Sequence, residues 1–216
     1  MSAARLVLAT HNPGKLTELR AILADVLAPD EITSAAELGT PDVKETGVTF
    51  AENALIKARA LARATGLVAV ADDSGLAVDV LGGAPGIFSA RWAGRHGDDR
   101  ANLELLLAQL ADIAPGHRQA SFVCAAALVT PDGHEHVEHG YLAGTLTTEP
   151  RGDGGFGYDP ILMPTGRDVT TAEIPAEEKN AISHRGQAFR ALTPHIGRAL
   201  GHDHRPSGSA GGPARV

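Results

Sequence analysis

The sequence has few cysteines and no long apolar run, and each shortage excludes a class of protein. Its 216 residues include one cysteine, so no disulfide can form within the chain. Cys124 stands in the apolar run 122–129, and we expect a buried thiol in a reducing compartment, the cytoplasm. No apolar stretch approaches the ~20 residues of a membrane-spanning helix, and the first ten residues lack the apolar core of a secretory signal. We therefore expect a cytoplasmic globular protein without a membrane partner.

Positive charge is also scarce. The chain has 19 Lys and Arg against 26 Asp and Glu, a formal net charge of -7 at neutral pH. Non-specific binding of DNA or RNA depends on a basic surface, so we expect no nucleic acid polymer as a partner. A few clustered Lys and Arg can still form a local positive pocket on an acidic protein, which leaves a small anionic ligand open.

Apolar runs alternate with amphipathic segments, and this alternation predicts an α/β protein. We expect buried strands at Leu6–Ala9 and Leu67–Ala71. An Asp-Gly pair between the strand-like runs Gln119–Thr130 and His136–Leu146 predicts a hairpin. Because a strand-rich middle follows the first strands and helices, the sheet is expected to be mixed. The preferred picture is an elongated mixed-sheet fold with two lobes and a central substrate groove.

Helix boundaries are marked by capping residues. Thr49 precedes an amphipathic segment that Gly66 is suited to end, and Ser183 is suited to cap the last helix. A third amphipathic helix is expected at 98–109. We expect a single domain over residues 1–200, followed by a disordered tail at 201–216 that is rich in Gly and Pro and has no apolar face.

The segment Leu6–Leu19 reads as a buried strand, a turn at Asn12-Pro13-Gly14 and the start of a helix. A helix start after a strand offers free backbone N–H groups and a positive dipole end, which suit an anion. The ammonium of Lys15 would add charge there. Many α/β proteins begin in this way and bind nothing, so that alternative stays open. A Walker A loop is excluded, because Ala9 and Leu16 replace its first glycine and its Ser or Thr.

Asp72-Asp73-Ser74-Gly75 follows the Leu67–Ala71 strand directly, and Leu76–Leu81 is expected to form a further strand. Ligand sites in open α/β sheets lie beyond the carboxyl ends of strands. Successive strand side chains point to opposite faces, so only one of the two carboxylates need enter a site. Carboxylates bind Mg²⁺ well, together with substrate phosphates. The alternative is a solvated turn.

Three further groups carry polar or aromatic chemistry. Lys179 and Arg185 are suited to phosphate or a base carbonyl, although an exposed basic helix face has the same composition. His184 is either an acid–base group or a hydrogen-bonding residue at a helix start. The aromatic rings among the glycines of residues 154–160 offer a stacking surface for a flat base, or else simply close a loop. Glu45 lies in a polar loop and by itself resembles any surface glutamate.

Taken together, five segments resemble the inosine/xanthosine triphosphate pyrophosphatases, a family that removes non-standard purine nucleotides. The segments are THNPGK, ETGVTFAENALIKARA, ADDSGLAVDVLGGAPGIFSARWAG, GGFGYDPI and AEEKNAISHRGQA. They occur in the order of the family and cover most of the chain from Leu6 to about Leu200. The resemblance implies an elongated fold with a central groove, a homodimer and Mg²⁺-dependent hydrolysis.

The resemblance also implies roles for individual residues. Asp73 is the catalytic carboxylate and a metal ligand, with Glu45 as the second ligand and Asp42 as its rival. The implied substrate-binding residues are Thr10, His11, Asn12, Pro13, Gly14, Lys15, Ser74, Phe156, Gly157, Tyr158, Asp159, Lys179, His184 and Arg185. The implied substrates are ITP, dITP and XTP, and the products are the nucleoside monophosphate and pyrophosphate.

The residues themselves are compatible with this mechanism. The negative charge of a triphosphate would be neutralised by Lys15, Lys179, a helix N-terminus and Mg²⁺. Asp73 would orient or deprotonate a water for attack on the α-phosphorus. A donor such as Arg185 would donate to the 6-oxo group of hypoxanthine or xanthine and would be left unpaired by the amino group of adenine. Two alternatives remain: a non-catalytic nucleotide-binding protein that uses the same groove, and a pyrophosphatase for modified pyrimidines or other damaged nucleotides.

Overall fold

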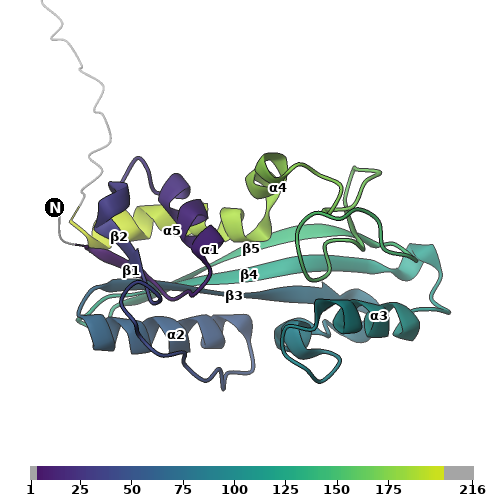
Figure 1. The fold of residues 1–216 in the computed structure, drawn as a ribbon, viewed down its shortest axis with the longest axis horizontal. Helices are drawn as coiled ribbons and strands as arrows, with labels where there is room; N and C mark the ends of the chain where they lie inside the picture. Colours follow the sequence, from purple (N-terminus) through teal and green to yellow (C-terminus); the bar gives the residue numbers. More distant parts are fainter. Residues whose placement is uncertain (1–3, 202–216) are drawn as a thin grey trace, which may run out of the picture.

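A computed structural model describes residues 4–201, which form a six-stranded mixed sheet with helices on both faces (Figure 1). The strand order is β2-β1-β3-β4-β5-β6. The strands are β1 (Leu6–Leu8), β2 (Ile32–Ser34), β3 (Val68–Val78), β4 (Gln119–Val129), β5 (Glu135–Leu146) and β6 (Leu162–Pro164). The helices are α1 (Pro13–Ile22), α2 (Phe50–Thr65), α3 (Asp99–Gln109), α4 (Ala176–Ile182) and α5 (His184–Ala199).

The sheet is mixed, as predicted. β1 pairs in parallel with both β2 and β3, whereas the pairs β3–β4, β4–β5 and β5–β6 are antiparallel. The predicted hairpin is confirmed as β4 and β5, joined by a turn in which Gly133 has φ +91°. The division into two lobes stays a prediction, as does the single domain at 1–200. The tail expected from residue 201 falls outside the described residues, except for Gly201 itself.

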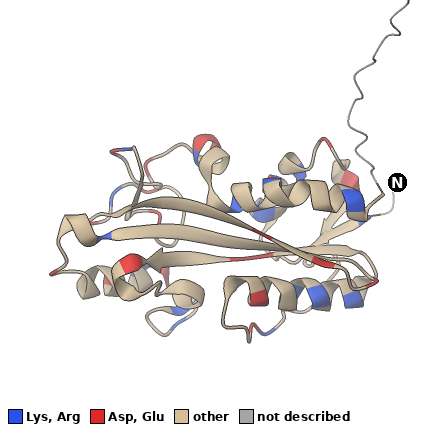
Figure 2. Cartoon of the chain, turned by 180° about the vertical axis from the view of Figure 1, so that it is seen from behind, with Lys and Arg blue, Asp and Glu red and all other residues tan. Residues whose placement is uncertain are grey.

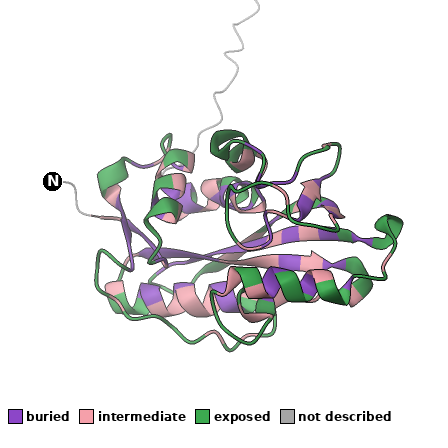
Figure 3. Ribbon diagram, turned by 45° about the vertical axis from the view of Figure 1, so that its right-hand side comes forward, coloured by how far each residue is buried: buried purple, intermediate pink, exposed green. Residues whose placement is uncertain are grey.

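Two apolar cores lie on opposite faces of the sheet at β1, β3 and β4. One packs α1 and α5 against alternate residues such as Val70, Cys124 and Leu128, and the other packs α2 against Ala71 and Ala127. Figure 3 shows buried residues of α2 alternating along the helix with residues of intermediate burial. A third core joins α3 to the far ends of β3 and β4 and to the loop before β6. α1, α2, α3 and α5 therefore each contribute an apolar stripe to a core, whereas α4 has no buried residue.

The capping residues act as the sequence indicates. Thr49 Oγ1 accepts from the backbone N–H of Glu52 at the start of α2, and Gly66 ends that helix in the left-handed conformation with φ +68°. Ser183 Oγ accepts from the N–H of Gly186 and caps α5. These local signals set where the two helices that flank the middle of the sheet begin.

One expected break in the sheet is absent. The sequence predicted two strands separated at Asp72-Asp73-Ser74-Gly75, and this was wrong, because β3 runs without interruption from Val68 to Val78. Asp72 pairs with Ala126 of β4 and Asp73 with Ala125, so the ladder continues through both acids. The polar side chains leave the sheet on either face and find partners there, so the backbone need not turn.

Gly75 lets a neighbouring segment approach β3 closely. A Cβ at this position would lie 2.4 Å from Oγ of Ser89 and 2.6 Å from the carbonyl oxygen of Gly86. Ser89 belongs to a short 3₁₀ helix, Gly86–Arg91, and its hydroxyl accepts from the N–H of Leu76. The glycine therefore joins this 3₁₀ helix to the strand that carries the acids.

Cys124 is buried in β4, as predicted, and burial raises the pKa of its thiol well above the usual range. Among residues 4–201, no helix is both long and apolar enough to cross a membrane. Basic side chains stand on both α2 and α5, the helices that flank the middle of the sheet (Figure 2). Of these, Lys57 of α2 contacts Asp73 and Arg185 of α5 contacts Asp72.

Candidate functional site

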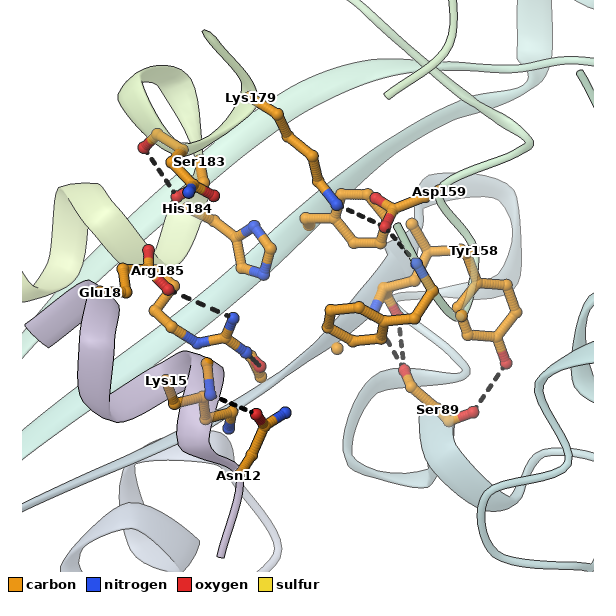
Figure 4. A pocket seen from close by; sticks show the side chains of 18 of the residues that line it. Asn12, Lys15, Glu18, Ser89, Tyr158, Asp159, Lys179, Ser183, His184 and Arg185 are labelled. Carbon is orange, nitrogen blue, oxygen red and sulfur yellow. Dashed lines mark hydrogen bonds and ion pairs between the residues drawn. The ribbon is translucent and has the colours of Figure 1, made fainter. Parts of the chain in front are cut away.

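Most of the residues singled out from the sequence line one pocket of about 650 Å³, named here the α5 pocket (Figure 4). Its lining comes from the start of α1, the middle of β3, the glycine-rich loop and the junction of α4 with α5. The predicted residues found in it are Asn12, Gly14, Lys15, Ser74, Phe156, Gly157, Tyr158, Asp159, Lys179, His184 and Arg185. The fold therefore gathers segments that are far apart in the sequence.

A second pocket of about 630 Å³, the α2 pocket, lies beside α2. It is lined by His11, Glu45, Lys57 and Arg91, among others. The run Thr10–Lys15 lies between the two pockets, since Asn12 and Lys15 line the first and His11 the second. Thr10 is buried and its Oγ1 accepts from the N–H of Asn12, which stabilises the turn.

Asp72 and Asp73 turn to opposite sides of the sheet, as strand geometry requires. Asp72 contacts Lys15 of α1 and Arg185 of α5, whereas Asp73 contacts Asn53 and Lys57 of α2. The strand thus turns one acid to each face, as expected of a regular strand, although the pair lies within β3 rather than at its end.

Asp72 is a buried anion held by two cations. Its side chain is 1% exposed, and its Oδ2 lies 2.9 Å from Nζ of Lys15 and 3.1 Å from Nε of Arg185. Burial alone would raise the pKa of Asp72, but the charges of Lys15 and Arg185 hold that pKa well below its usual range. Asp72 thus fixes the two basic side chains, both of which line the α5 pocket.

Asp73 belongs to a different cluster. Nδ2 of Asn53 donates to its Oδ2 at 3.1 Å, and Nζ of Lys57 lies 3.6 Å from its Oδ1 and 2.6 Å from Oε1 of Glu45. Burial raises the pKa of Asp73, Lys57 opposes that shift, and the nearby charge of Glu45 reinforces it. The carboxylates of Asp73 and Glu45 thus converge on one ammonium. Together they form a site that suits a cation, named here the Asp73–Glu45 place.

The rival metal ligand, Asp42, lines the α2 pocket as well but has a different partner. It is exposed and its Oδ1 pairs with Nδ1 of His11 at 2.8 Å. Of the two acids, it is therefore Glu45 that shares a cationic partner with Asp73. Lys57 and Asn53 were missed from the sequence, where Lys57 was placed outside the apolar face of its helix. Their four-residue spacing on one side of α2 was the available signal.

The glycine-rich loop presents one exposed ring and anchors another. Phe156 is 63% exposed, and Nζ of Lys179 lies 5.4 Å from its ring centroid. Asp159 accepts from the N–H of Phe156 at 2.8 Å and pairs with Lys179. The hydroxyl of buried Tyr158 donates to the carbonyl oxygen of Ser89 at 2.8 Å. Phe156 is thus free to meet a ligand, while Tyr158 holds the loop.

His184 points into the centre of the α5 pocket (Figure 4). Its ring stacks on Phe122 with centroids 5.1 Å apart, and its Nδ1 is buried without a hydrogen-bond partner among the described residues. Burial and the charge of Arg185 lower the pKa of His184 to about 3. The ring is therefore neutral at pH 7, which favours hydrogen bonding over the role of a cationic acid.

The chain is similar to known proteins over most of its length. Residues 6–195 match the Ham1 family. The chain is 70% identical over 198 residues to a dITP/XTP pyrophosphatase of Streptomyces coelicolor, a match that covers 91% of this chain and 99% of the relative. A solved HAM1 protein of Coxiella burnetii has 42% identity and a TM-score of 0.83, with 91% of this chain and all of that chain covered. A solved dITP/XTP pyrophosphatase of Mycobacterium abscessus has 52% identity and a TM-score of 0.73, with coverages of 88% and 98%.

Proposed function

Because the chain belongs to the Ham1 family, we propose that it hydrolyses the non-canonical purine nucleotides ITP, dITP and XTP to the nucleoside monophosphate and pyrophosphate. Relatives named dITP/XTP pyrophosphatase match it at 70% and 69% identity over almost their whole length. The observation that carries the proposal is that Asp72 contacts Lys15 and Arg185, which line the α5 pocket, whereas Asp73 contacts Lys57, which lines the α2 pocket. Asp72 positions the two cations for an anionic ligand, and Asp73 would bind a metal ion and a water molecule.

The cation place between Asp73 and Glu45 fits Mg²⁺. Both are carboxylates, the ligands that Mg²⁺ prefers, and both already contact a positive charge on Lys57. Asp73 and Glu45 would hold the ion, which supplies neutralisation of the triphosphate and polarisation of its phosphorus–oxygen bonds. The substrate phosphates would complete its coordination.

Asp73 is the proposed general base. A raised pKa makes its carboxylate a better proton acceptor than an ordinary aspartate, and Asn53 fixes the orientation of its Oδ2. Asp73 would orient a water and take its proton as the oxygen attacks the α-phosphorus. Lys57, beside Asp73, would stabilise the negative charge that builds up on the phosphate.

The purine is proposed to lie in the α5 pocket. The exposed ring of Phe156 offers a stacking face, and the unpaired Nδ1 of His184 offers a hydrogen bond. Arg185 would donate to the 6-oxo group of hypoxanthine or xanthine, whereas the 6-amino group of adenine would leave that donor unpaired. Mismatches of this kind discriminate by ~10⁴-fold or more. Lys15 and Lys179 would neutralise phosphate oxygens, together with the turn at Thr10–Gly14.

The deciding experiment is a nucleotide panel with separate detection of phosphate and pyrophosphate. We expect Mg²⁺-dependent release of pyrophosphate from ITP, dITP and XTP, and label from ¹⁸O-water in the monophosphate. Orthophosphate as first product, or label only in pyrophosphate, would refute attack at the α-phosphorus. Tight ITP binding without turnover would instead favour a nucleotide-binding protein, and turnover of modified pyrimidines alone would favour a different pyrophosphatase.

A matched pair of variants tests the role of Asp73. Asp73→Asn should abolish turnover while the protein stays folded. Asp79→Asn, in the exposed 3₁₀ turn that directly follows β3, should leave turnover unchanged. Full activity in Asp73→Asn would remove Asp73 from its proposed role.

We also propose that the protein is a cytoplasmic homodimer that keeps inosine and xanthosine nucleotides out of DNA and RNA, in a house-cleaning role. The resemblance of the sequence to the pyrophosphatase family supports this proposal. Light scattering after size-exclusion chromatography measures the molar mass directly, and a mass near the 22.3 kDa of one chain would refute the dimer.

A further inference from the structure

A cluster of two histidines and a glutamate lies outside both pockets, where β5 meets α5. His136 and Glu138 are alternate residues of β5 and therefore share one face of that strand, and His195 reaches them from the last turns of α5. Nε2 of His136 lies 2.7 Å from Oε1 of Glu138, and Nε2 of His195 lies 3.3 Å from the same oxygen. The two imidazole rings stack with centroids 3.3 Å apart.

This is the one such cluster among residues 4–201, and its atoms have the spacing of a metal site. The three ligand atoms, one from each residue, all lie within 4.8 Å of one another. Zinc holds nitrogen and oxygen ligands at ~2.0–2.2 Å, so two ligands of one ion lie at most ~4.4 Å apart. The spacing is therefore close to that of ligands that share one ion, and side-chain rotations would have to supply the remaining change.

The cluster is held by rigid elements and remains open to solvent. His136 pairs with Leu128 in the β4–β5 ladder and Glu138 with Ala126, while α5 packs on both strands. The three side chains are 23–31% exposed, which leaves a route for an ion from water. Binding would thus order little that the fold has not already ordered.

We propose that His136, Glu138 and His195 bind a divalent transition metal ion of the Zn²⁺ type. Two imidazoles and one carboxylate form the donor set that suits zinc with a water in the fourth position. Mg²⁺ prefers an all-oxygen set, so this site and the Asp73–Glu45 place select different metals. The ion would join β5 to the C-terminal half of α5, at the opposite end of that helix from His184 and Arg185.

Arg198 opposes the ion and so provides a specific test. Its guanidinium lies 2.9 Å from Nδ1 of His195 and can only donate, so Nδ1 now holds the lone pair. Coordination through Nε2 requires the proton on Nδ1, and Arg198 must then move away. Arg198 is exposed and can do so. Its removal should tighten metal binding, which loss of an ordinary surface arginine would not.

The experiment is calorimetric titration of ZnCl₂ into the tag-free protein with millimolar Mg²⁺ present to occupy the Asp73–Glu45 place. The background is the full chain with His202→Ala and His204→Ala, because those two histidines are further candidate ligands in the sequence. We expect one equivalent of zinc, and a rise in melting temperature of about 5–10 °C when free zinc is 100 times its dissociation constant. Co²⁺ in place of zinc should give visible absorption bands.

Variants decide the assignment. His136→Ala and His195→Ala should each weaken zinc binding by more than ~10-fold, since even changes beyond the first ligands cost that much. His139→Ala, on the same strand but outside the cluster, should bind as before, and Arg198→Ala should bind more tightly. Equal melting temperatures of all variants in EDTA check that each one is folded. Absence of binding in the background protein, or binding unaffected by His136→Ala and His195→Ala, would overturn the site.

Discussion

The ammonium of Lys57 lies 3.6 Å from Oδ1 of Asp73, and the same ammonium lies 2.6 Å from Glu45. A basic residue of α2 is therefore shared between the strand and the loop that precedes the helix. The ionisation of Asp73 depends on both neighbours, since Lys57 lowers its pKa and Glu45 raises it, while burial raises it further.

The first prediction concerns the pKa of Asp73 in the metal-free protein. We expect a value above the ~3.9 of an ordinary aspartate, measured from the carboxyl carbon by ¹³C NMR. Glu45→Gln removes a negative neighbour and should lower that pKa, whereas Lys57→Met removes a positive neighbour and should raise it. Added Mg²⁺ should lower it. A pKa that does not respond to Glu45→Gln would contradict the cluster.

The two adjacent acids should affect stability in opposite ways. Asp72→Asn leaves Lys15 and Arg185 without their shared buried partner, and should cost about 3–5 kcal/mol of unfolding free energy at pH 7. Because the folded pKa of Asp72 is lowered, its contribution is present above the unfolded value and is lost as pH falls below ~3.9. The gap between wild type and Asp72→Asn should therefore close in acid.

Asp73→Asn is the matched comparison, and the unfolding free energy of both variants is measured by urea titration across pH. The folded pKa of Asp73 is raised, so stability from its protonated form is present below the unfolded pKa and is lost as pH rises through the folded pKa. At pH 7 the neutral asparagine should thus leave the unfolding free energy unchanged or higher. A large loss of stability in Asp73→Asn would show that its contacts with Asn53 and Lys57 matter more than its desolvation.

Phe156 should contribute to nucleotide binding and not to folding. Its ring is 63% exposed, so Phe156→Ala should leave the melting temperature unchanged. Base–aromatic stacking is worth ~1–3 kcal/mol, which predicts a rise of roughly 5- to 150-fold in the KM for ITP. Phe88→Ala is the control, because Phe88 is 49% exposed and lies outside the α5 pocket. Equal KM values for the two variants would place the base elsewhere.

Gly75 is predicted to be intolerant of even a methyl group. Gly75→Ala would bring a Cβ to 2.4 Å from Ser89 and 2.6 Å from the carbonyl oxygen of Gly86, so the 3₁₀ helix must move away from β3. We expect a loss of about 1–3 kcal/mol in unfolding free energy by chemical denaturation. Gly116→Ala, where an added Cβ meets nothing within 4 Å, should change stability little.

Local signals in the sequence predicted the helices and the hairpin well. Thr49, Gly66 and Ser183 act within one turn of the chain, so their effect is visible in the sequence itself. The failure at Asp72-Asp73-Ser74-Gly75 has a tertiary cause, because two adjacent acids resemble a turn until their partners are known. Those partners, Lys15 and Lys57, stand 57 and 16 residues away in the chain.

The candidate site was predicted unevenly for the same reason. Motif residues such as Phe156, Lys179 and His184 do line one pocket. Lys57 has no special sequence context, and its position beside Asp73 follows only from the packing of α2 on β3. The sequence could not decide between Glu45 and Asp42 either, because the geometry of the loop determines which acid contacts Lys57.

The uninterrupted strand β3 fixes the distance between Asp72 and Asp73. Two successive residues of one strand serve the two pockets, and successive residues are separated by only ~3.3 Å along a strand. The covalent backbone, rather than a hinge or an interface, therefore fixes the distance between the cations beside Asp72 and the cluster around Asp73. A ligand that contacts both clusters must therefore match a distance that the rigid peptide backbone sets.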